Sequence, residues 1–202
     1  MRRGLQRSIL ALAICLWLAG QGCSPAYEFK GSAMEPPLTI PDFELTANDG
    51  RPLRLSQIEE EIVLVYFGYT FCPDVCPLTL ADVRTALNEL PPAERGRVRL
   101  LFISADPERD TPETLARYLS AFDADFTGMT GDIEAIQAVM QPFGAYAEKA
   151  EVAESAAGYL VNHTARLYLL NAQREVVVTY PFGFETEALS SDVAHLLRKA
   201  TE

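Results

Sequence analysis

The stretch that decides the fold is residues 62–77, which read IVLVYFGYTFCPDVCP. Its first part, residues 62–67, is a continuous apolar run, and such runs are typical of strands that are buried on both faces of a sheet. Cys72 and Cys76 follow, and beyond them apolar residues recur at steps of three and four, which indicates a helix. The stretch therefore predicts a buried strand that leads through a cysteine-bearing turn into a helix, which the two prolines at 91–92 end.

The rest of the chain alternates strands and helices around this unit. Alternating apolar residues on both sides of Asn48-Asp49-Gly50 predict an N-terminal hairpin. The further elements expected are a buried strand at 98–103, helices that begin at Thr111 and Asp132, a strand pair at 166–170 and 176–180, and a closing helix at 189–197. Parallel strands joined by helices and followed by an antiparallel pair describe an α/β sheet with helices on both faces. We therefore expect a thioredoxin-like fold with an N-terminal hairpin, a central mixed sheet and flanking helices.

Residues 1–23 differ from the rest of the chain and are typical of an export signal. Three arginines lie among the first seven residues, and an apolar run of 11 residues follows at 9–19. A membrane-spanning helix needs about 20 apolar residues, so the run is better explained as the hydrophobic part of a signal peptide. Cys23 follows small residues and resembles the lipid-acceptor cysteine of bacterial lipoproteins, although Gly20 stands where those proteins usually carry a larger aliphatic residue. An uncleaved short anchor and plain secretion are the alternatives.

The expected domain boundaries follow from these segments. Residues 24–39 contain glycine, serine and two adjacent prolines without a periodic pattern, and we expect them to be a tether of limited reach. The folded domain is expected at 40–202, with a surface loop at 148–158, which is rich in alanine and glutamate. Every alternative for the leader places this domain outside the cytoplasm. The lipoprotein interpretation places it on the periplasmic side of a bacterial envelope, anchored to the membrane.

The charge of the chain excludes one class of partner. Without residues 1–23, 14 basic and 28 acidic residues remain, which is a net charge of −14. Such a surface repels nucleic acid and anionic lipid. We therefore expect no nucleic-acid partner, whereas a protein partner with a basic face is compatible with this charge.

Two of the four cysteines lie in the expected domain. At the start of a helix, free backbone N–H groups and the positive end of the helix dipole lower the pKa of a thiol and favour the thiolate. Asp74 is the expected cap, which puts Cys76 in the first turn and Cys72 just before it. The spacing leaves three interpretations open: a redox-active disulfide between Cys72 and Cys76, a metal site for a soft ion such as Cu(I), and a structural disulfide.

Two histidines are available as a third metal ligand, His163 and His195. His195 lies in the closing helix, away from its apolar stripe, and we expect it to be a solvated surface residue. His163 comes just before an expected strand, and in a thioredoxin-like fold that strand lies near the start of the cysteine-bearing helix. A single histidine before a strand is usually an ordinary residue. The interpretation of His163 as a metal ligand therefore depends on its expected position near the cysteines in a thioredoxin-like fold.

Four blocks of the sequence resemble those of one protein family. Residues 66–77 (YFGYTFCPDVCP) resemble the signature of the Sco/SenC family, the copper-binding proteins of cytochrome oxidase assembly. Residues 104–112, 126–131 and 159–164 resemble the second, third and histidine blocks of that family. The blocks follow the family order over residues 43 to about 197, and the first is long and specific. The chain is therefore identified as a member of the Sco/SenC family.

The resemblance implies a thioredoxin fold and one copper ion, Cu(I) or Cu(II), bound by Cys72, Cys76 and His163. It also implies a metallochaperone rather than an enzyme, which delivers copper to the dinuclear copper centre of a cytochrome c oxidase subunit or reduces the cysteines of that centre. The implied partners are that subunit, a copper donor protein or thioredoxin-like reductant, and the membrane through the N-terminal anchor. The competing hypothesis is a thiol–disulfide reductase or redox sensor that acts through Cys72 and Cys76.

The chain departs from the family pattern next to the histidine. The family usually carries Asp before the histidine, and this chain carries Asn162, which can hydrogen-bond to the imidazole without adding charge. Asn162 and Asp74 are the residues expected to support the copper ligands without binding the ion. No proline precedes Leu167, where ordinary thioredoxins keep a cis-proline beside their dithiol, and His163 in that neighbourhood favours a metal site.

A cluster of charges follows the second buried strand, at Asp106, Glu108, Arg109 and Asp110. We expect it to be a structural network at the start of the helix that follows. Docking of a partner protein is the alternative.

Overall fold

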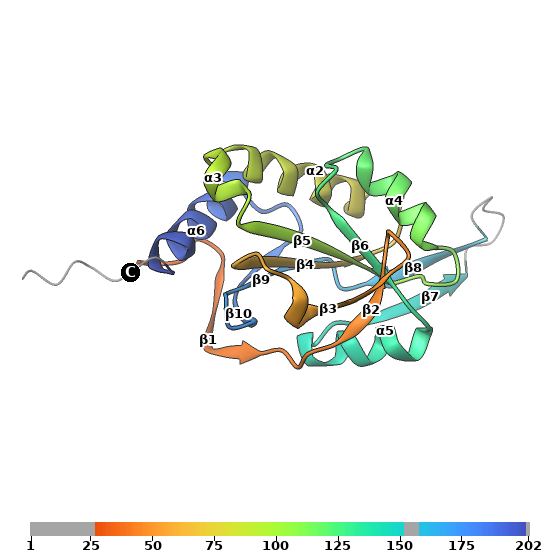
Figure 1. The fold of residues 1–202 in the computed structure, drawn as a ribbon. Helices are drawn as coiled ribbons and strands as arrows, with labels where there is room; N and C mark the ends of the chain where they lie inside the picture. Colours follow the sequence, from red (N-terminus) through yellow and green to blue (C-terminus); the bar gives the residue numbers. More distant parts are fainter. Residues whose placement is uncertain (1–26, 152–157, 201–202) are drawn as a thin grey trace, which may run out of the picture.

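The computed structural model describes residues 27–151 and 158–200, and its centre is an eight-stranded mixed sheet (Figure 1). The strands are β1 (Ser32–Thr39), β2 (Glu44–Ala47), β3 (Pro52–Arg54), β4 (Ile62–Gly68), β5 (Val98–Ser104), β6 (Thr127–Thr130), β9 (Arg166–Leu170) and β10 (Glu175–Pro181). Their order in the sheet is β1-β10-β9-β4-β5-β6-β2-β3. Strand β5 runs parallel to both β4 and β6, and the other pairings in this sheet are antiparallel.

Helices cover both faces of the sheet. They are α2 (Val75–Asn88), α3 (Pro92–Arg95), α4 (Pro112–Ser120), α5 (Ile133–Met140) and α6 (Thr186–Lys199), with 3₁₀ turns η1 (Leu55–Gln57) and η2 (Gln141–Phe143). Helices α2, α3, α4 and α6 lie on one side of the sheet and α5 lies on the other (Figure 1). The crossovers from β4 to β5 and from β5 to β6 step in the same direction, so their right-handedness puts α2 and α4 on one face. The α/β, thioredoxin-like architecture expected from the sequence is confirmed.

Strand β4 lies in the middle of the core and leads directly into the turn that carries the cysteines. All seven of its residues are buried, because it pairs with β5 on one edge and β9 on the other and has helices on both faces. This double burial is why the strand reads as an unbroken apolar run.

The start sites of two helices also agree with the sequence. Thr111 caps α4 by accepting the N–H of Thr114, and Asp132 caps α5 by accepting the N–H of Ala135.

The expectation of a tether up to residue 39 is wrong for its described part. Strand β1 pairs antiparallel with β10 at the edge of the sheet. Ahead of it, the buried carboxylate of Asp192 accepts the backbone N–H groups of Lys30 and Gly31 and the hydroxyl of Tyr27. An edge strand has one partner and one solvated side, so it needs no apolar alternation and tolerates the prolines at 36–37, which lie in an irregularity of the ladder.

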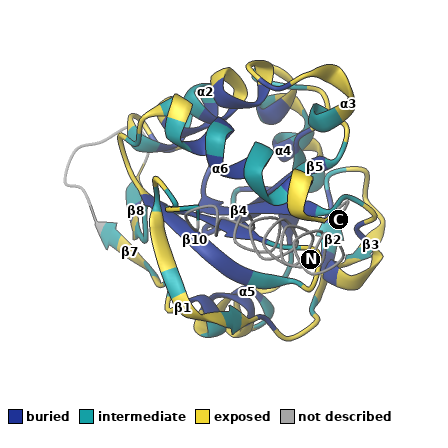
Figure 2. Cartoon of the chain, turned by 90° about the vertical axis from the view of Figure 1, so that its left-hand side faces the viewer, coloured by how far each residue is buried: buried dark blue, intermediate teal, exposed yellow. Residues whose placement is uncertain are grey.

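The expected surface loop at 148–158 is also partly wrong. Strand β7 (Ala147–Glu151) pairs antiparallel with β8 (Tyr159–His163), and the two form a separate sheet. Figure 2 shows this β7–β8 hairpin at one edge of the molecule, beside the buried strands of the central sheet. Its strands are not sandwiched in the core, so they lack the apolar run by which β4 is recognised. Residues 152–157 lie outside the described residues.

The expected export signal at 1–23, with Cys23, lies outside the described residues. None of the helices in residues 27–151 and 158–200 combines the length and the apolar composition that a membrane-spanning helix requires.

Candidate metal centre

The first half of the site is the turn between β4 and α2. The backbone N–H of Cys72 donates to the carbonyl of Tyr69 at 3.2 Å, and the N–H of Cys76 donates to the sulfur of Cys72 at 3.5 Å. Asp74 is the cap residue, as expected, but it is exposed and its side chain makes no capping hydrogen bond. The sulfur of Cys72 therefore takes the place that a cap oxygen usually fills, at the positive end of the helix.

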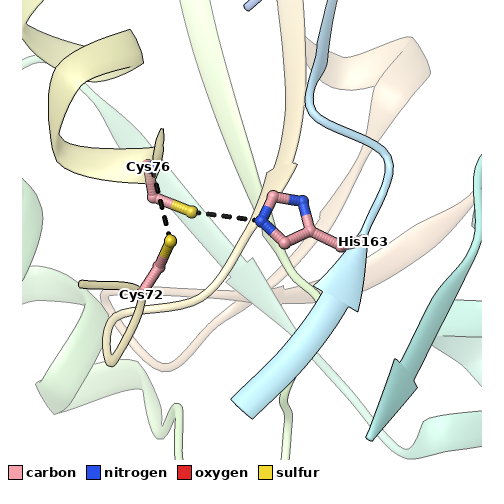
Figure 3. Close-up of side chains that lie close together, drawn as sticks. All are labelled: Cys72, Cys76 and His163. Carbon is pink, nitrogen blue, oxygen red and sulfur yellow. Dashed lines mark hydrogen bonds between the residues drawn. The ribbon is translucent and has the colours of Figure 1, made fainter. Parts of the chain in front are cut away.

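The second half of the site is His163, the last residue of β8. Its Nε2 lies 3.4 Å from the Sγ of Cys76, and its Nδ1 lies 3.3 Å from the carbonyl oxygen of Thr164 (Figure 3). A carbonyl can only accept, so this contact favours the tautomer in which Nδ1 carries the proton and Nε2 presents its lone pair to the cysteines. The rings of Tyr66 and Tyr69 stand edge-on to the imidazole and fix its plane.

The pKa values of the two thiols are shifted in opposite directions. The hydrogen bond from the Cys76 thiol, together with hydrogen bonds from the backbone, lowers the pKa of Cys72 to about 4. The negative sulfur of Cys72 and burial raise the pKa of Cys76 far above the ordinary range. The pair therefore holds one proton between its two sulfurs, which a bound cation would displace. Tyr66 also points its hydroxyl at the Cys76 sulfur, 3.9 Å away.

A buried carboxylate holds the cysteine turn from behind. Asp110 is fully buried and accepts the hydroxyl of Thr70 at 2.6 Å, the N–H of Thr70 at 3.1 Å and the hydroxyl of Ser104 at 2.7 Å. The charge cluster is thus structural, as expected, but Asp110 supports the turn before Cys72 rather than the start of α4. The sequence carries no signal for this role, since the partner lies 40 positions away.

Asn162 and His195 both differ from what the sequence predicts. Asn162 is exposed and pairs with Glu148 of β7. Successive side chains on a strand point to opposite faces, so Asn162 is directed away from the His163 ring. His195 is half-buried rather than solvated, because its ring stacks on Tyr27 with the ring centroids 3.8 Å apart. Neither residue belongs to the group of potential metal-binding side chains in the described part of the chain.

That group consists of Cys72, Cys76 and His163, whose ligand atoms all lie within 4.8 Å of one another. Donors that bind one ion at roughly 2.0–2.3 Å lie about 3.5–4 Å apart when three of them surround it. The group needs little adjustment to reach that spacing. Two sulfurs and one imidazole nitrogen suit a soft or borderline ion such as copper or zinc.

The fold and this group define a thioredoxin-like protein with a two-cysteine, one-histidine metal-type site. Residues 32–198 match the family model described as SCO1/SenC, and the chain belongs to that family.

Relatives and solved structures that are similar to this chain carry Sco names. The Arabidopsis thaliana protein SCO1 homolog 2, mitochondrial, is 30% identical over 87% of this chain and 61% of its own length. The solution structure of apo Sco1 from Thermus thermophilus is 36% identical, with a TM-score of 0.75 over 86% of this chain and 99% of that one. The structure of Bradyrhizobium japonicum ScoI with copper bound is 32% identical, with a TM-score of 0.70 over 78% and 99%. The matches span 61–63% of the length of the first two curated relatives.

Proposed function

We propose that this chain binds one copper ion through Cys72, Cys76 and His163. The observation that carries the proposal is the convergence of these three donors from two segments 87 residues apart in the sequence. Such a convergence serves no evident packing purpose, because an apolar side chain would fill the same space without desolvating polar atoms. Copper bound to a relative that is 32% identical supports the choice of metal.

The donor set accounts for both oxidation states of copper. Thiolates are soft ligands that select Cu(I), and an imidazole beside them also suits Cu(II). The hydrogen bond from Nδ1 of His163 to the carbonyl of Thr164 directs Nε2 toward the sulfurs, as the outer nitrogen of a metal-binding histidine usually does.

We infer further that copper is cargo and that the protein is a metallochaperone. Cys72 and His163 line an open hollow of about 350 Å³ together with Tyr69 and Tyr146. A partner ligand can enter such a hollow and replace the three donors one at a time, which a closed structural site would prevent. Family membership supports the dinuclear copper centre of a cytochrome c oxidase subunit as the acceptor.

We base the proposed place of action on the N-terminal sequence. The basic start, the short apolar run and Cys23 favour export and attachment to the membrane as a bacterial lipoprotein. The strand β1 begins at Ser32, so no more than eight residues separate Cys23 from the sheet. The domain would then stay close to the membrane surface, where the subunits of a respiratory oxidase lie.

A second function is favoured by the lowered pKa of Cys72. A thiolate next to a second thiol can attack a disulfide and be released by its neighbour, which is the chemistry of a thiol–disulfide reductase. That chemistry needs Cys72 and Cys76 but not His163.

One experiment separates the two functions. The full chain is reduced, loaded with copper and freed of excess metal, and the copper-to-protein ratio is measured for the wild type and for His163→Ala. A ratio of one in the wild type and a large loss in the variant support the copper chaperone. A wild type that retains no copper, with disulfide turnover unchanged in His163→Ala, would identify a reductase.

A further inference from the structure

The hairpin that carries His163 is not part of the central sheet. Strands β7 and β8 pair with each other and with none of the eight strands of that sheet, and Figures 1 and 2 show them at one edge of the molecule. His163 is therefore held by no strand ladder of the central sheet, only by the short connection of residues 164–165 to β9. Side-chain contacts between the hairpin and the rest of the domain fix the remainder of its position.

One set of these contacts centres on Arg109, in the turn after β5. Its guanidinium lies over the ring of Tyr159, with Cζ 3.7 Å from the centroid, and its Nη1 donates to the Tyr159 carbonyl at 3.1 Å. Its Nε donates to the carboxylate of Asp106, which also accepts the Tyr159 hydroxyl at 2.8 Å. Asp106, Arg109 and Tyr159 thus form a closed triangle, which we call the clasp, between the body of the domain and the first residue of β8.

The clasp is in a protected setting. Asp106 is 1% exposed, and the side chain of Arg109 is 17% exposed. Ion pairs and stacks that are shielded from water are stronger than those on the surface. By contrast, the Lys149–Glu108 pair that ties β7 to the same turn has both side chains about half exposed, so it contributes little.

The same arginine also reaches the cysteine half of the site. Its guanidinium lies 4.8 Å from the ring centroid of Phe71, the residue before Cys72, and 5.8 Å from that of Tyr69. The ring of Tyr69 stands edge-on to His163, with centroids 5.7 Å apart. One side chain therefore contacts the cysteine turn and the histidine hairpin together.

We propose that the clasp positions His163 against Cys72 and Cys76, with Arg109 as its central positioning residue. The proposal rests on the proposed copper function and adds to it a control on the third ligand. With the clasp closed, copper meets two sulfurs and the imidazole; with it open, the hairpin is free to carry the imidazole away, and copper keeps the two sulfurs. Cu(II) depends on the imidazole more than Cu(I) does, because two thiolates already suit Cu(I).

The test is a double-mutant cycle on the full chain, with Arg109→Ala, His163→Ala and the double variant. Copper affinity is measured by competition in both oxidation states. We expect Arg109→Ala to weaken Cu(II) binding about 3- to 10-fold, the size of coupling found through packed side-chain networks, and to weaken Cu(I) binding less. In the His163→Ala background, Arg109→Ala should cause no further loss. Equal losses in both backgrounds, or none in either, would overturn the proposal.

Two further variants separate geometry from charge. Arg109→Lys should behave like Arg109→Ala, because lysine cannot stack flat on Tyr159 and donate sideways at once. Tyr159→Phe keeps the stacked ring and loses one hydroxyl, so it should show a smaller loss of Cu(II) affinity. It replaces Arg109→Ala in the double-mutant cycle if that variant fails to fold. Arg117→Ala, an exposed arginine on α4, is the matched control and should leave both affinities unchanged.

A second measurement needs no copper. Amide hydrogen exchange in the metal-free protein should be faster for β8 in Arg109→Ala than in the wild type, and unchanged for β4. Faster exchange in β8 with a wild type that binds no copper would contradict the proposed function and leave the clasp supported. Unchanged exchange in β8 would overturn the clasp whatever the copper result.

Discussion

The Nε2 atom of His163 lies 3.4 Å from the Sγ atom of Cys76, although 87 residues separate the two in the sequence. The contact joins the end of the β7–β8 hairpin to the first turn of α2, and Cys72 lies against both (Figure 3). A nitrogen lone pair and two sulfurs that meet in this way form a ready ligand set for one ion.

Removal of a single ligand should cripple copper binding. Cys72→Ser, Cys76→Ser and His163→Ala each leave a gap that only water can fill. We expect each loss to be at least the roughly 10–100-fold that removal of a supporting group outside the coordination sphere causes. Competition titrations with a chromogenic chelator measure it. His195→Ala is the control, since this ring stacks on Tyr27 and takes no part in the site; near-normal binding by His163→Ala would refute the assignment.

Oxidation of the two cysteines should abolish copper binding. A disulfide between Cys72 and Cys76 consumes both thiolates and leaves one imidazole. Copper uptake is measured on the fully oxidised and the fully reduced chain, with thiol counts to establish each state. Equal uptake by the oxidised chain would mean that the metal binds elsewhere.

The reactivity of Cys72 should persist in acid. A pKa lowered to about 4 keeps this sulfur a thiolate as the pH falls from 8 to 6, so its alkylation rate by iodoacetamide should stay nearly constant. An ordinary thiol with a pKa of about 8.5 would slow roughly 75-fold over that range. Peptide mass spectrometry after timed alkylation follows Cys72 separately from Cys76. A steep fall for Cys72 between pH 8 and 6 would contradict the hydrogen-bonded arrangement of the pair.

Replacement of the Asp110 carboxylate should loosen the cysteine turn. Asp110→Asn puts an NH₂ group where an oxygen now accepts from Thr70 or Ser104, so at least one buried donor loses its partner. We expect the free energy of unfolding to fall by about 1–3 kcal/mol. Urea denaturation measures the change, and Glu113→Gln on the exposed start of α4 serves as the control. A change below about 0.5 kcal/mol, typical of surface substitutions, would show that the turn does not depend on this carboxylate.

Restoration of the family residue at position 162 should change copper affinity little. Asn162 is exposed and its side chain is directed away from the His163 ring, so Asn162→Asp adds a solvated charge that salt screens. We expect the Cu(I) and Cu(II) affinities to stay within about threefold of the wild type, well below the effect of a group that contacts the ligand. A tenfold gain for Cu(II) alone would show that residue 162 reaches the imidazole when copper is bound.

The sequence predicts the parts of the fold whose burial is complete. Strand β4 reads as an apolar run because both of its faces are covered, and α4 and α5 are found through the caps Thr111 and Asp132. Edge elements have no such constraint. Strands β1 and β7 leave much of their surface to solvent, so their sequences match those of irregular segments, and the sequence alone predicts a tether and a loop there.

The candidate site likewise has one part that the sequence predicts and one part that it does not. The cysteine pair is local, and its spacing before a helix marks it in the sequence. The meeting of His163 with Cys76, the support of Thr70 by Asp110 and the clasp of Arg109 on Tyr159 depend on how distant segments pack, which no local pattern encodes. The direction of the Asn162 side chain is decided by the strand character of β8, in which neighbouring side chains point to opposite faces.

The most direct test of the copper site is X-ray absorption at the copper edge of the reduced full chain loaded with one equivalent of Cu(I). We expect a first shell of two sulfurs and one imidazole nitrogen, and the loss of the imidazole contribution in His163→Ala with the two sulfurs retained. A first shell of nitrogen and oxygen alone, or a sulfur-bridged cluster of several coppers, would contradict the site formed by Cys72, Cys76 and His163.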